Sequence, residues 1–536
     1  MTHPSNPLSP ERSITINTFD PTLYIFEAAF AGEREYADPI RNLTLTVDFA
    51  GPADAHRRVD AFWDGGRTWR VRFSPPVSGE WRYTTSCSDP SAAGLHGQSG
   101  SFTAMPYAGD LPLLRHGPVS TSADGHSLAH ADGTPFFWLG DTAWNGVLKA
   151  QPADWDQYLE TRREQGFTAI QAVITHWRSF PEDAVGEKAF DGLESIQINP
   201  AFYQRLDAKV AAIAAHGLAP SPVLIWACTP KDPGHYLSAE DCIVLARYEV
   251  ARYAAYRPLW ILGGDGEYRG ESAQKWIETG RAVFGAVIDA DHSLAVTMHP
   301  QGINWPGDDL RDEKWLTFHS YQSGHGDNDD HLRWLQHGPP ATDWAIEPVK
   351  PIINQEPNYE HHLSYHSRLL FTAFHVRRAC YWSLLVSPTA GVTYGHHGIW
   401  PWMEESGVPA DHAYTGESPS WRESLHAEGA EQIRHLRTLF DALNWPKLRP
   451  AQDLLVEQPG DANPNHFIAA AREEEGGPVV VYTPAGDPIR LSISLVNARW
   501  FDPRTGVWQA AGAGAGAEFA PPDNGDWLLL GEKPGA

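Results

Sequence analysis

The chain has little cysteine and no long apolar run. Its 536 residues include four cysteines without a Cys-x-x-Cys pair or metal-type spacing, so buried free thiols are expected and no metal site is predicted. No stretch approaches the length of a membrane-spanning helix, and residues 1–12 lack the apolar segment of a signal peptide. These absences predict a cytoplasmic location and no membrane partner.

Positive charge is also scarce. Lys and Arg number 41 against 67 Asp and Glu, which gives a formal net charge of −26. Nucleic acids and anionic membrane surfaces recruit basic patches, so neither is an expected partner. The balance fits a protein that acts on a neutral substrate. The oligomeric state stays open.

Aromatic residues, by contrast, are abundant, with 22 Trp and 18 Tyr. Their rings combine a flat apolar face with a polar edge, which suits the C–H faces and hydroxyls of sugars. Large barrels and sandwiches also bury many aromatic side chains. We therefore expect most of them in the core and the remainder near a site.

The rhythm of the sequence predicts three domains. Residues 10–105 show short alternating strands such as Leu43–Phe49, separated by Gly, Pro, Asp and Ser, which is typical of a small β-sandwich. From residue 115 to 447, strands alternate with amphipathic helices, which indicates a parallel sheet. Residues 450–536 return to β character and predict a second sandwich.

Eight candidate strands in the central region predict a closed (β/α)8 TIM barrel. They are Phe136–Gly140, Thr168–Ile174, Ala219–Trp226, Leu259–Gly263, Leu294–Met298, Trp315–His319, Ile352–Gln355 and Ala379–Leu385. A doubly wound open sheet is the structural alternative. The first strand, however, is followed by no glycine-rich phosphate turn.

Two of these strands end on a carboxylate. Trp260-Ile261-Leu262-Gly263-Gly264-Asp265 ends the fourth strand, and Pro351-Ile352-Ile353-Asn354-Gln355-Glu356 ends the seventh. Active sites of such barrels lie at the C-terminal rim of the strands, where the fourth and seventh face each other. Paired carboxylates cleave glycosidic bonds, one as nucleophile and one as acid. Glu267 and Glu360, near the same rim, are weaker candidates.

Other strand ends supply polar and aromatic groups that suit a sugar. Histidines follow several of them, and a neutral imidazole can donate to a hydroxyl or hold a carboxylate ionised. Tyr321 is predicted to hydrogen-bond the nucleophile, and Trp382 to form a platform under a sugar ring. The predicted substrate-binding residues are Asp141, Trp144, His176, Trp177, Trp226, His299, His319, Tyr321, Tyr359, Trp382 and His396.

Two other functions compete with this interpretation. The histidines would also suit a metal-dependent barrel hydrolase, but the first strand offers no His-x-His pair and the fourth no lysine that could bridge two metals. A non-catalytic carbohydrate-binding protein is the second alternative. It would be marked by loss of one acid, and both are present. No Gly-x-Ser-x-Gly elbow supports a serine hydrolase.

Several motifs together resemble a known group. Phe137-Trp138-Leu139-Gly140-Asp141-Thr142-Ala143-Trp144, Gly263-Gly264-Asp265, Asn354-Gln355-Glu356-Pro357-Asn358-Tyr359-Glu360 and Gly391-Val392-Thr393-Tyr394-Gly395-His396 are similar to the apiosidase-like barrel family of glycoside hydrolases. Phe73–Tyr83 is similar to the sandwich that precedes such barrels. Ala498–Gly506 resembles the small sandwich, named for collagen binding, that often follows them.

The resemblance implies a glycoside hydrolase that removes a terminal or branching sugar, such as apiose or another pentose, without a cofactor. Asp265 matches the family's acid/base and Glu356 its nucleophile, so a retaining mechanism is expected. Many relatives in the wider clan carry Asn-Glu where this chain has Gly264-Asp265. We expect Glu356 to be ionised at neutral pH and the pKa of Asp265 to be raised.

Overall fold

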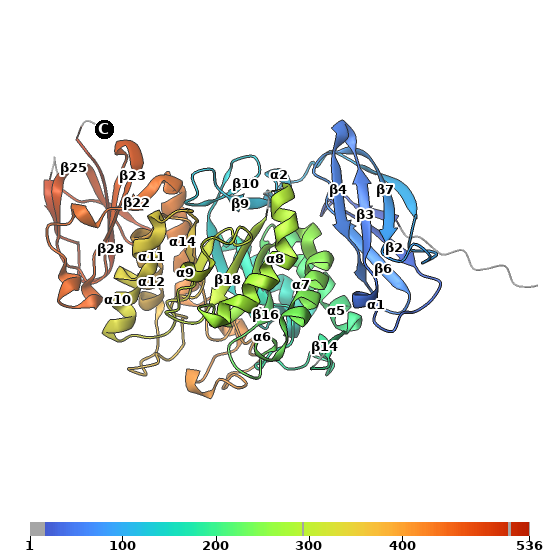
Figure 1. Cartoon of the computed structure of the whole chain (residues 1–536). Helices are drawn as coiled ribbons and strands as arrows, with labels where there is room; N and C mark the ends of the chain where they lie inside the picture. Colours follow the sequence, from blue (N-terminus) through green and yellow to red (C-terminus); the bar gives the residue numbers. More distant parts are fainter. Residues whose placement is uncertain (1–16, 194, 292–293, 513–515, 535–536) are drawn as a thin grey trace, which may run out of the picture.

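The computed structural model describes residues 17–193, 195–291, 294–512 and 516–534. Residues 1–12, on which the absence of a signal peptide was argued, lie outside these ranges, as do the outermost residues of the two predicted sandwiches. A central barrel stands between two β-sandwiches (Figure 1). This confirms the predicted fold class. None of the described helices is both long enough and apolar enough to cross a membrane.

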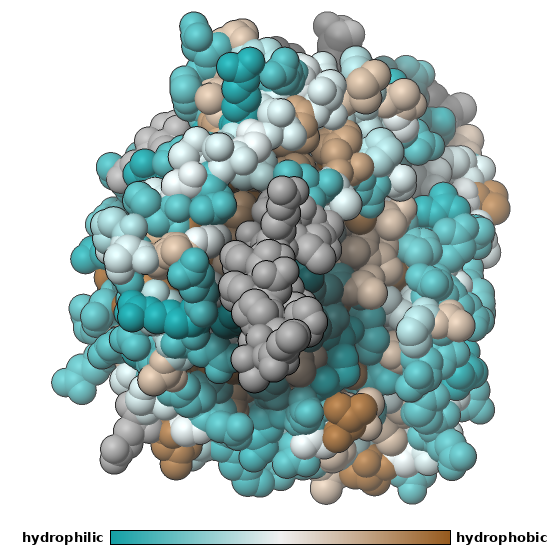
Figure 2. All heavy atoms as spheres, turned by 90° about the vertical axis from the view of Figure 1, so that its right-hand side faces the viewer, coloured by the Kyte–Doolittle hydropathy of each residue, from teal (hydrophilic) through white to brown (hydrophobic). Residues whose placement is uncertain are grey.

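The N-terminal sandwich consists, within the described residues, of two four-stranded antiparallel sheets. One contains β1 (Asn17–Asp20), β2 (Ile25–Ala31), β6 (Thr68–Phe73) and β5 (Phe62–Trp63); the other contains β4 (His56–Asp60), β3 (Leu45–Ala50), β7 (Gly79–Cys87) and β8 (Ser99–Ala104). Stacked rings fill the space between them, with the centroids of Phe26 and Phe102 4.0 Å apart. The outer face at this end of the molecule is mostly hydrophilic, with apolar residues in separate small patches (Figure 2).

The barrel is formed by eight parallel strands in the described part of the chain. They are β12 (Trp138–Thr142), β13 (Ala169–Val173), β16 (Ala219–Trp226), β17 (Leu259–Gly266), β18 (Ala295–Pro300), β19 (His319–Tyr321), β20 (Ile352–Asn354) and β21 (Gly391–Tyr394). The ring closes between β18 and β19, where the Thr317 amide donates to Val296 O at 2.9 Å. The Thr297 hydroxyl donates to Phe318 O at 2.8 Å beside it.

Helices cover the outside of the barrel (Figure 1). The longer ones are α4 (Pro152–Glu164), α5 (Pro200–Ala215), α7 (Ala239–Tyr253), α8 (Glu271–Asp291), α10 (Asp329–His337), α12 (Ala373–Val386) and α14 (Glu428–Asp441). At the N-terminal end of the strands, a small sheet of β9 (Val119–Thr121), β10 (Leu128–His130) and β11 (Pro135–Phe136) contributes to an apolar layer with Trp138, Phe318 and Ile353. This layer leaves the opposite rim for chemistry.

One predicted strand is a helix. Residues 379–385, expected as the eighth strand, lie in α12, and the eighth strand is β21. A short, continuous apolar run looks alike in a buried strand and in a buried helix. Here the run is apolar all round because α12 lies between the barrel and the C-terminal sandwich, with Tyr381 stacked on Tyr482 at 5.0 Å.

The C-terminal sandwich is built on an antiparallel sheet. Its strands are β22 (Leu448–Pro450), β23 (Ala469–Glu473), β24 (Val479–Thr483), β28 (Trp527–Glu532), β25 (Ile489–Phe501) and β26 (Trp508–Ala510), with β27 (Gly516–Phe519) paired to β25. Buried or partly buried charge pairs attach both outer domains to the barrel. Arg377 of α12 holds Asp526 through two hydrogen bonds of 2.8 and 3.0 Å, and Arg72 of β6 holds Asp207 of α5 at 2.6 Å.

Candidate active site

Glu356 lies at the rim just beyond β20, held by two histidines from neighbouring strands. Its Oε2 is 3.1 Å from His299 Nε2, on β18, and its Oε1 is 3.0 Å from His325 Nε2, beyond β19. The Tyr359 amide donates to His325 Nδ1 at 3.4 Å, so Nε2 of the neutral His325 ring carries the proton and donates to the carboxylate. Three consecutive strands therefore combine to hold one acid.

This setting favours the ionised form of Glu356. The side chain is only 9% exposed, and burial alone would raise its pKa. The hydrogen bonds from His299 and His325 outweigh burial and hold the pKa of Glu356 well below its usual range. The result is a buried carboxylate that stays charged and accepts hydrogen bonds from two imidazoles.

Asp265 occupies the end of β17, in a backbone conformation with φ of +50°. The preceding Gly264 is required by packing, because a Cβ there would lie 2.4 Å from the Trp226 ring. A left-handed conformation at a non-glycine residue is uncommon, though Asp tolerates it better than most. The Gly-Gly-Asp sequence thus bends the strand end against Trp226 and fixes where the short carboxylate emerges.

The surroundings of Asp265 favour its protonated form. Its side chain is 17% exposed. Burial, followed by the charge of Glu356, raises the pKa of Asp265 to about 6, against the opposing effects of Cys228 and Arg178. The two acids are therefore close enough to interact electrostatically, and their surroundings shift their pKa values in opposite directions.

Arg178 provides the positive charge beside Asp265. Its Nη2 is 3.9 Å from Asp265 Oδ2, and its Nη1 is 2.9 Å from Asp232 Oδ2. His412 Nδ1 lies 2.8 Å from Ala410 O and must donate to it, so its Nε2, 3.0 Å from Arg178 Nη2, accepts. The guanidinium is thereby fixed by a carboxylate and a neutral imidazole.

Several predicted aromatic residues gather next to the acids. The Trp144 ring lies 5.2 Å from both Trp226 and His299, and Trp177 lies 4.5 Å from Trp226. The ring of Tyr359 is 4.5 Å from His325, and the charge of Glu356 acts on its phenol. These residues form an aromatic wall beside Glu356.

Other predicted residues point elsewhere. Asp141 lies within β12 and faces outward, where Tyr158 and Arg162 of α4 donate to its Oδ2 at 2.6 and 2.5 Å. The site role predicted for Asp141 is therefore wrong. Alternate side chains of a strand face opposite sides, and Asp141 is on the side that faces the helices. Asp141 joins a strand to a helix and does not reach the acids.

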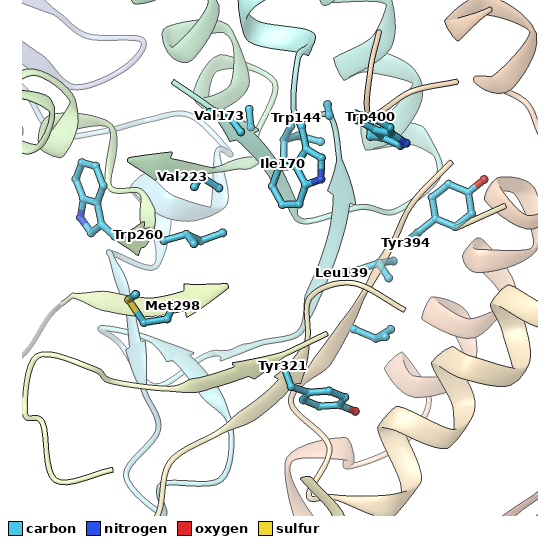
Figure 3. Close-up of a cluster of buried hydrophobic side chains, with 14 of the residues drawn as sticks. Leu139, Trp144, Ile170, Val173, Val223, Trp260, Met298, Tyr321, Tyr394 and Trp400 are labelled. Atoms are coloured by element: carbon cyan, nitrogen blue, oxygen red, sulfur yellow. The ribbon is translucent and has the colours of Figure 1, made fainter. Parts of the chain in front are cut away.

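His319 and Tyr321 are corrected for a related reason. The sixth strand was predicted to end at His319, but β19 begins there. The C-terminal end of this strand, which lies at the rim, is therefore further along the chain, toward His325. His319 packs against Trp305 with ring centroids 5.2 Å apart. Tyr321 points away from the barrel interior (Figure 3) and lies 5.8 Å from Trp334 of α10, so it does not contact the nucleophile candidate.

Trp382 does not lie under a sugar. It belongs to α12, and its indole N–H donates to Phe467 O of the C-terminal unit at 2.9 Å. The platform role predicted for it is therefore wrong.

His176 and His396 hold loops in place. Nδ1 of His176 accepts from the Ala189 amide at 3.3 Å, and burial lowers the pKa of His176 to about 4. Nδ1 of His396 accepts from the Gly398 amide at 3.0 Å.

The weaker acid candidates are both engaged away from the pair. Glu360 receives hydrogen bonds from the Tyr394 hydroxyl at 2.7 Å and from the Gly429 amide at 3.0 Å, near the start of α14. Glu267 is exposed and bonds Arg269 at 2.9 Å. Within the described residues, no three His, Cys, Asp or Glu side chains are grouped so as to hold a metal ion.

Sequence reasoning missed Arg178, Asp232 and His412. They lie on the loops that follow β13, β16 and β21, where neither periodicity nor a strand end marks a residue. His325, on the loop that follows β19, is likewise absent from the predicted site residues. The position of Arg178 directly after His176-Trp177, at a predicted strand end, was the one available signal.

Family models match most of the chain. The model described as "Apiosidase-like, catalytic domain" matches residues 122–447, which is more than half of the sequence. A domain of unknown function, DUF5060, matches residues 22–88, and a "Putative collagen-binding domain of a collagenase" matches residues 449–532. No curated protein matches the chain.

Solved structures of low sequence identity share the fold. A structure titled "Glycoside hydrolase" matches with a TM-score of 0.68 at 24% identity, covering 80% of this chain and 99% of its own. A glycoside hydrolase family 5 structure from Bacteroides vulgatus matches with a TM-score of 0.67 at 21% identity, covering 80% and 95%. These matches support the architecture, and the family model covers the catalytic barrel. The chain therefore belongs to the apiosidase-like family, and its barrel is a glycoside hydrolase-like catalytic domain.

Proposed function

We propose that this protein hydrolyses an O-glycosidic bond with Glu356 as nucleophile and Asp265 as acid and base. The observation that carries the proposal is the opposite electrostatic setting of two rim carboxylates. Two histidine donors hold Glu356 ionised, whereas burial and the Glu356 charge raise the pKa of Asp265 to about 6. A nucleophile must be ionised and a general acid protonated, so each setting suits one role.

In the first step, a Glu356 oxygen attacks the anomeric carbon. The bond from that carbon to the leaving oxygen breaks, and Asp265 transfers its proton to this oxygen. The charge on Glu356 is consumed as the glycosyl ester forms. The pKa of Asp265 then falls, because part of its elevation comes from the Glu356 charge.

In the second step, the ionised Asp265 accepts a proton from water as the water oxygen attacks the anomeric carbon. The ester bond to Glu356 breaks, which restores its carboxylate and its hydrogen bonds to His299 and His325. Two displacements at one carbon retain the anomeric configuration. Retention is thus the proposed stereochemical outcome.

The proposed substrate is a carbohydrate that carries a terminal or branching sugar, such as apiose or another pentose. The small exposed fractions of the Glu356 and Asp265 side chains, 9% and 17%, favour a small glycon at the end of a chain. Trp144, Trp177, Trp226 and Tyr359 are proposed to contact its ring. The family name supports apiose as the first sugar to test.

Product release from a panel of apiosides, arabinosides, xylosides and other aryl glycosides tests the proposal. Wild type is compared with Glu356→Gln, and Glu360→Gln serves as a matched control because Glu360 is a buried acid of the same loop. We expect activity on one sugar, a loss of several orders of magnitude in Glu356→Gln, and activity within a few fold of wild type in Glu360→Gln.

Other outcomes discriminate among the alternatives. Equal activity in wild type and Glu356→Gln would remove Glu356 from the mechanism and favour the alternative of a metal-dependent barrel hydrolase. Binding without turnover of any glycoside would favour a carbohydrate-binding protein. For the active sugar, the anomer first formed, observed by proton NMR, distinguishes retention from inversion.

A further inference from the structure

Two exposed tyrosines stand at the rim of the otherwise buried site. Tyr365 lies on the loop after β20 and is 43% exposed, and Tyr414 lies on the loop after β21 and is 51% exposed. Their ring centroids are 6.0 Å apart, and their planes are inclined by 49°. The two rings therefore form one continuous, partly open aromatic surface, here named the tyrosine pair.

Backbone hydrogen bonds fix the loops that carry the tyrosine pair. The Tyr365 amide donates to His325 O at 2.9 Å, which ties the first loop to the residue that holds Glu356. The Leu363 amide donates to Thr415 O at 3.2 Å, which joins the first loop to the second, next to Tyr414. The two rings are thus presented by a connected support.

Tyr365 is one contact away from the proposed nucleophile. Its ring lies 5.5 Å from that of His325, whose Nε2 bonds Glu356 at 3.0 Å. The pKa of the Tyr365 phenol lies well above its usual value. Partial burial is the largest cause, and the neighbouring Tyr414 and the charges of Glu356 and Asp265 raise the pKa further. Both acids therefore act on the same ring.

Tyr414 approaches the proposed acid from the other side. Its ring lies 5.9 Å from His412, which accepts a hydrogen bond from Arg178 at 3.0 Å. Arg178 in turn lies 3.9 Å from Asp265. The tyrosine pair consequently bridges the surroundings of the two acids.

We propose that the tyrosine pair binds the leaving group and selects glycosides whose leaving group presents a flat apolar face next to the scissile oxygen. The inference rests on the proposed function. A glycon must reach the more buried Glu356 beside Trp144 and Trp226, whereas the leaving group departs on the side of the more exposed Asp265. Aromatic aglycones and sugar rings both offer such a face to a tyrosine.

Kinetics with leaving groups of different size test the proposal. The variants are Tyr365→Ala, Tyr414→Ala and the double variant, with Tyr36→Ala, a half-buried tyrosine that packs on the N-terminal sandwich, as the matched control. The substrates share one glycon and carry 4-nitrophenol, a second sugar or fluoride as leaving group. Fluoride is too small to contact the tyrosine pair and needs no proton.

We expect the ratio of kcat/KM for the 4-nitrophenyl glycoside to that for the fluoride to fall about tenfold in the double variant. Phe at both positions should restore the ratio, because it retains the ring. A larger loss on the disaccharide than on the aryl glycoside would identify a sugar as the natural leaving group, and the reverse an aromatic aglycone. An unchanged ratio, or an equal loss on the fluoride, would overturn the proposal.

Binding separates failure of this inference from failure of the proposed function. Saturation-transfer NMR on the 4-nitrophenyl glycosides of the panel reports contact between the aryl ring and the protein without turnover. Aryl contact that is lost in the double variant supports the tyrosine pair even if no glycoside is cleaved. Aryl contact that is absent, or that persists in the double variant, contradicts it even if the two acids prove catalytic.

Discussion

The acids at the barrel rim lie on two sides, an inner and an outer one, which differ in the side chains that surround each carboxyl group. Asp265 and Glu356 face the inside of the rim, where imidazoles and a guanidinium lie close and part of each side chain stays exposed. Asp141 faces outward, is fully buried, and has one oxygen satisfied by Arg162 and Tyr158. A fully buried acid that is paired with an arginine and a tyrosine of its own protein serves the fold, whereas one left partly exposed can serve a substrate.

Histidines divide in the same way. His299 and His325 direct Nε2 at a carboxylate on the inner side. His319 is outward, and burial holds its pKa well below the usual value, so it is a neutral core residue. The difference between the regions therefore lies in the direction of the side chain, since the residue types are the same.

Apart from loss of the proposed nucleophile, the largest effect on the inner side is expected from Asp265→Asn. Loss of the acid and base should lower kcat/KM for glycosides with poor leaving groups by about 10²–10⁴-fold. Stability should be unchanged or slightly higher, because a buried ionisable group becomes neutral. Steady-state kinetics and thermal unfolding measure the two effects.

Two controls sharpen this prediction. Glu267→Gln changes an exposed acid two residues away and should leave kcat/KM within a few fold of wild type. Added azide, which needs no general base, should restore turnover of Asp265→Asn on substrates with good leaving groups. A fall in activity accompanied by an equal loss of folded protein would mean that Asp265 has only a structural role.

The matching substitution on the outer side is Asp141→Ala. It leaves the guanidinium of Arg162 buried without its carboxylate, so the free energy of unfolding should fall by about 3–5 kcal/mol. The kcat of the folded fraction should stay near that of wild type. Denaturant unfolding and active-site-normalised rates check this, and a large loss of kcat with normal stability would return Asp141 to the site.

A smaller effect is expected from His325→Ala. Removing one hydrogen bond to a charged carboxylate costs about 1.5–3 kcal/mol, which corresponds to a loss of roughly 10–150-fold in kcat/KM. The pKa of Glu356 should rise, so the acidic limb of the pH–rate profile should move to higher pH. His319→Ala, on the outer side, should leave that limb in place.

The sequence predicted the two acids because each follows an unmistakable apolar strand, and Gly263-Gly264-Asp265 and Asn354-Gln355-Glu356 mark the ends closely. It did not predict whether Asp141, His319 and Tyr321 face the inside or the outside of the barrel. The sixth strand was placed too early, and such a shift changes which side chains are taken to lie at the rim and on which face. Trp382 was misassigned because its apolar run fits a strand and a buried helix equally.

The loop residues near Asp265 could not be predicted from the sequence for a different reason. Arg178 lies beside Asp265, and His412 lies beside Arg178, on loops that follow β13 and β21; their proximity depends on closure of the barrel. No pattern within either segment encodes it. Local sequence thus located the two candidate acids, and the closed fold supplied the groups that shift their pKa values.

The smallest predicted effect is a shift in pH dependence on removing Arg178. With the pKa of Asp265 at about 6, kcat/KM should fall above pH 6 as the acid loses its proton. The charge of Arg178 favours the ionised form of Asp265, so Arg178→Gln should raise the pKa of Asp265 and move the alkaline limb of the pH–rate profile to higher pH. Asp232 already neutralises much of the guanidinium charge, which limits the shift to about one unit or less. A limb that moves to lower pH would show that Arg178 acts on another group, whereas a shift to higher pH would mean that Arg178 controls the pH range in which Asp265 can donate.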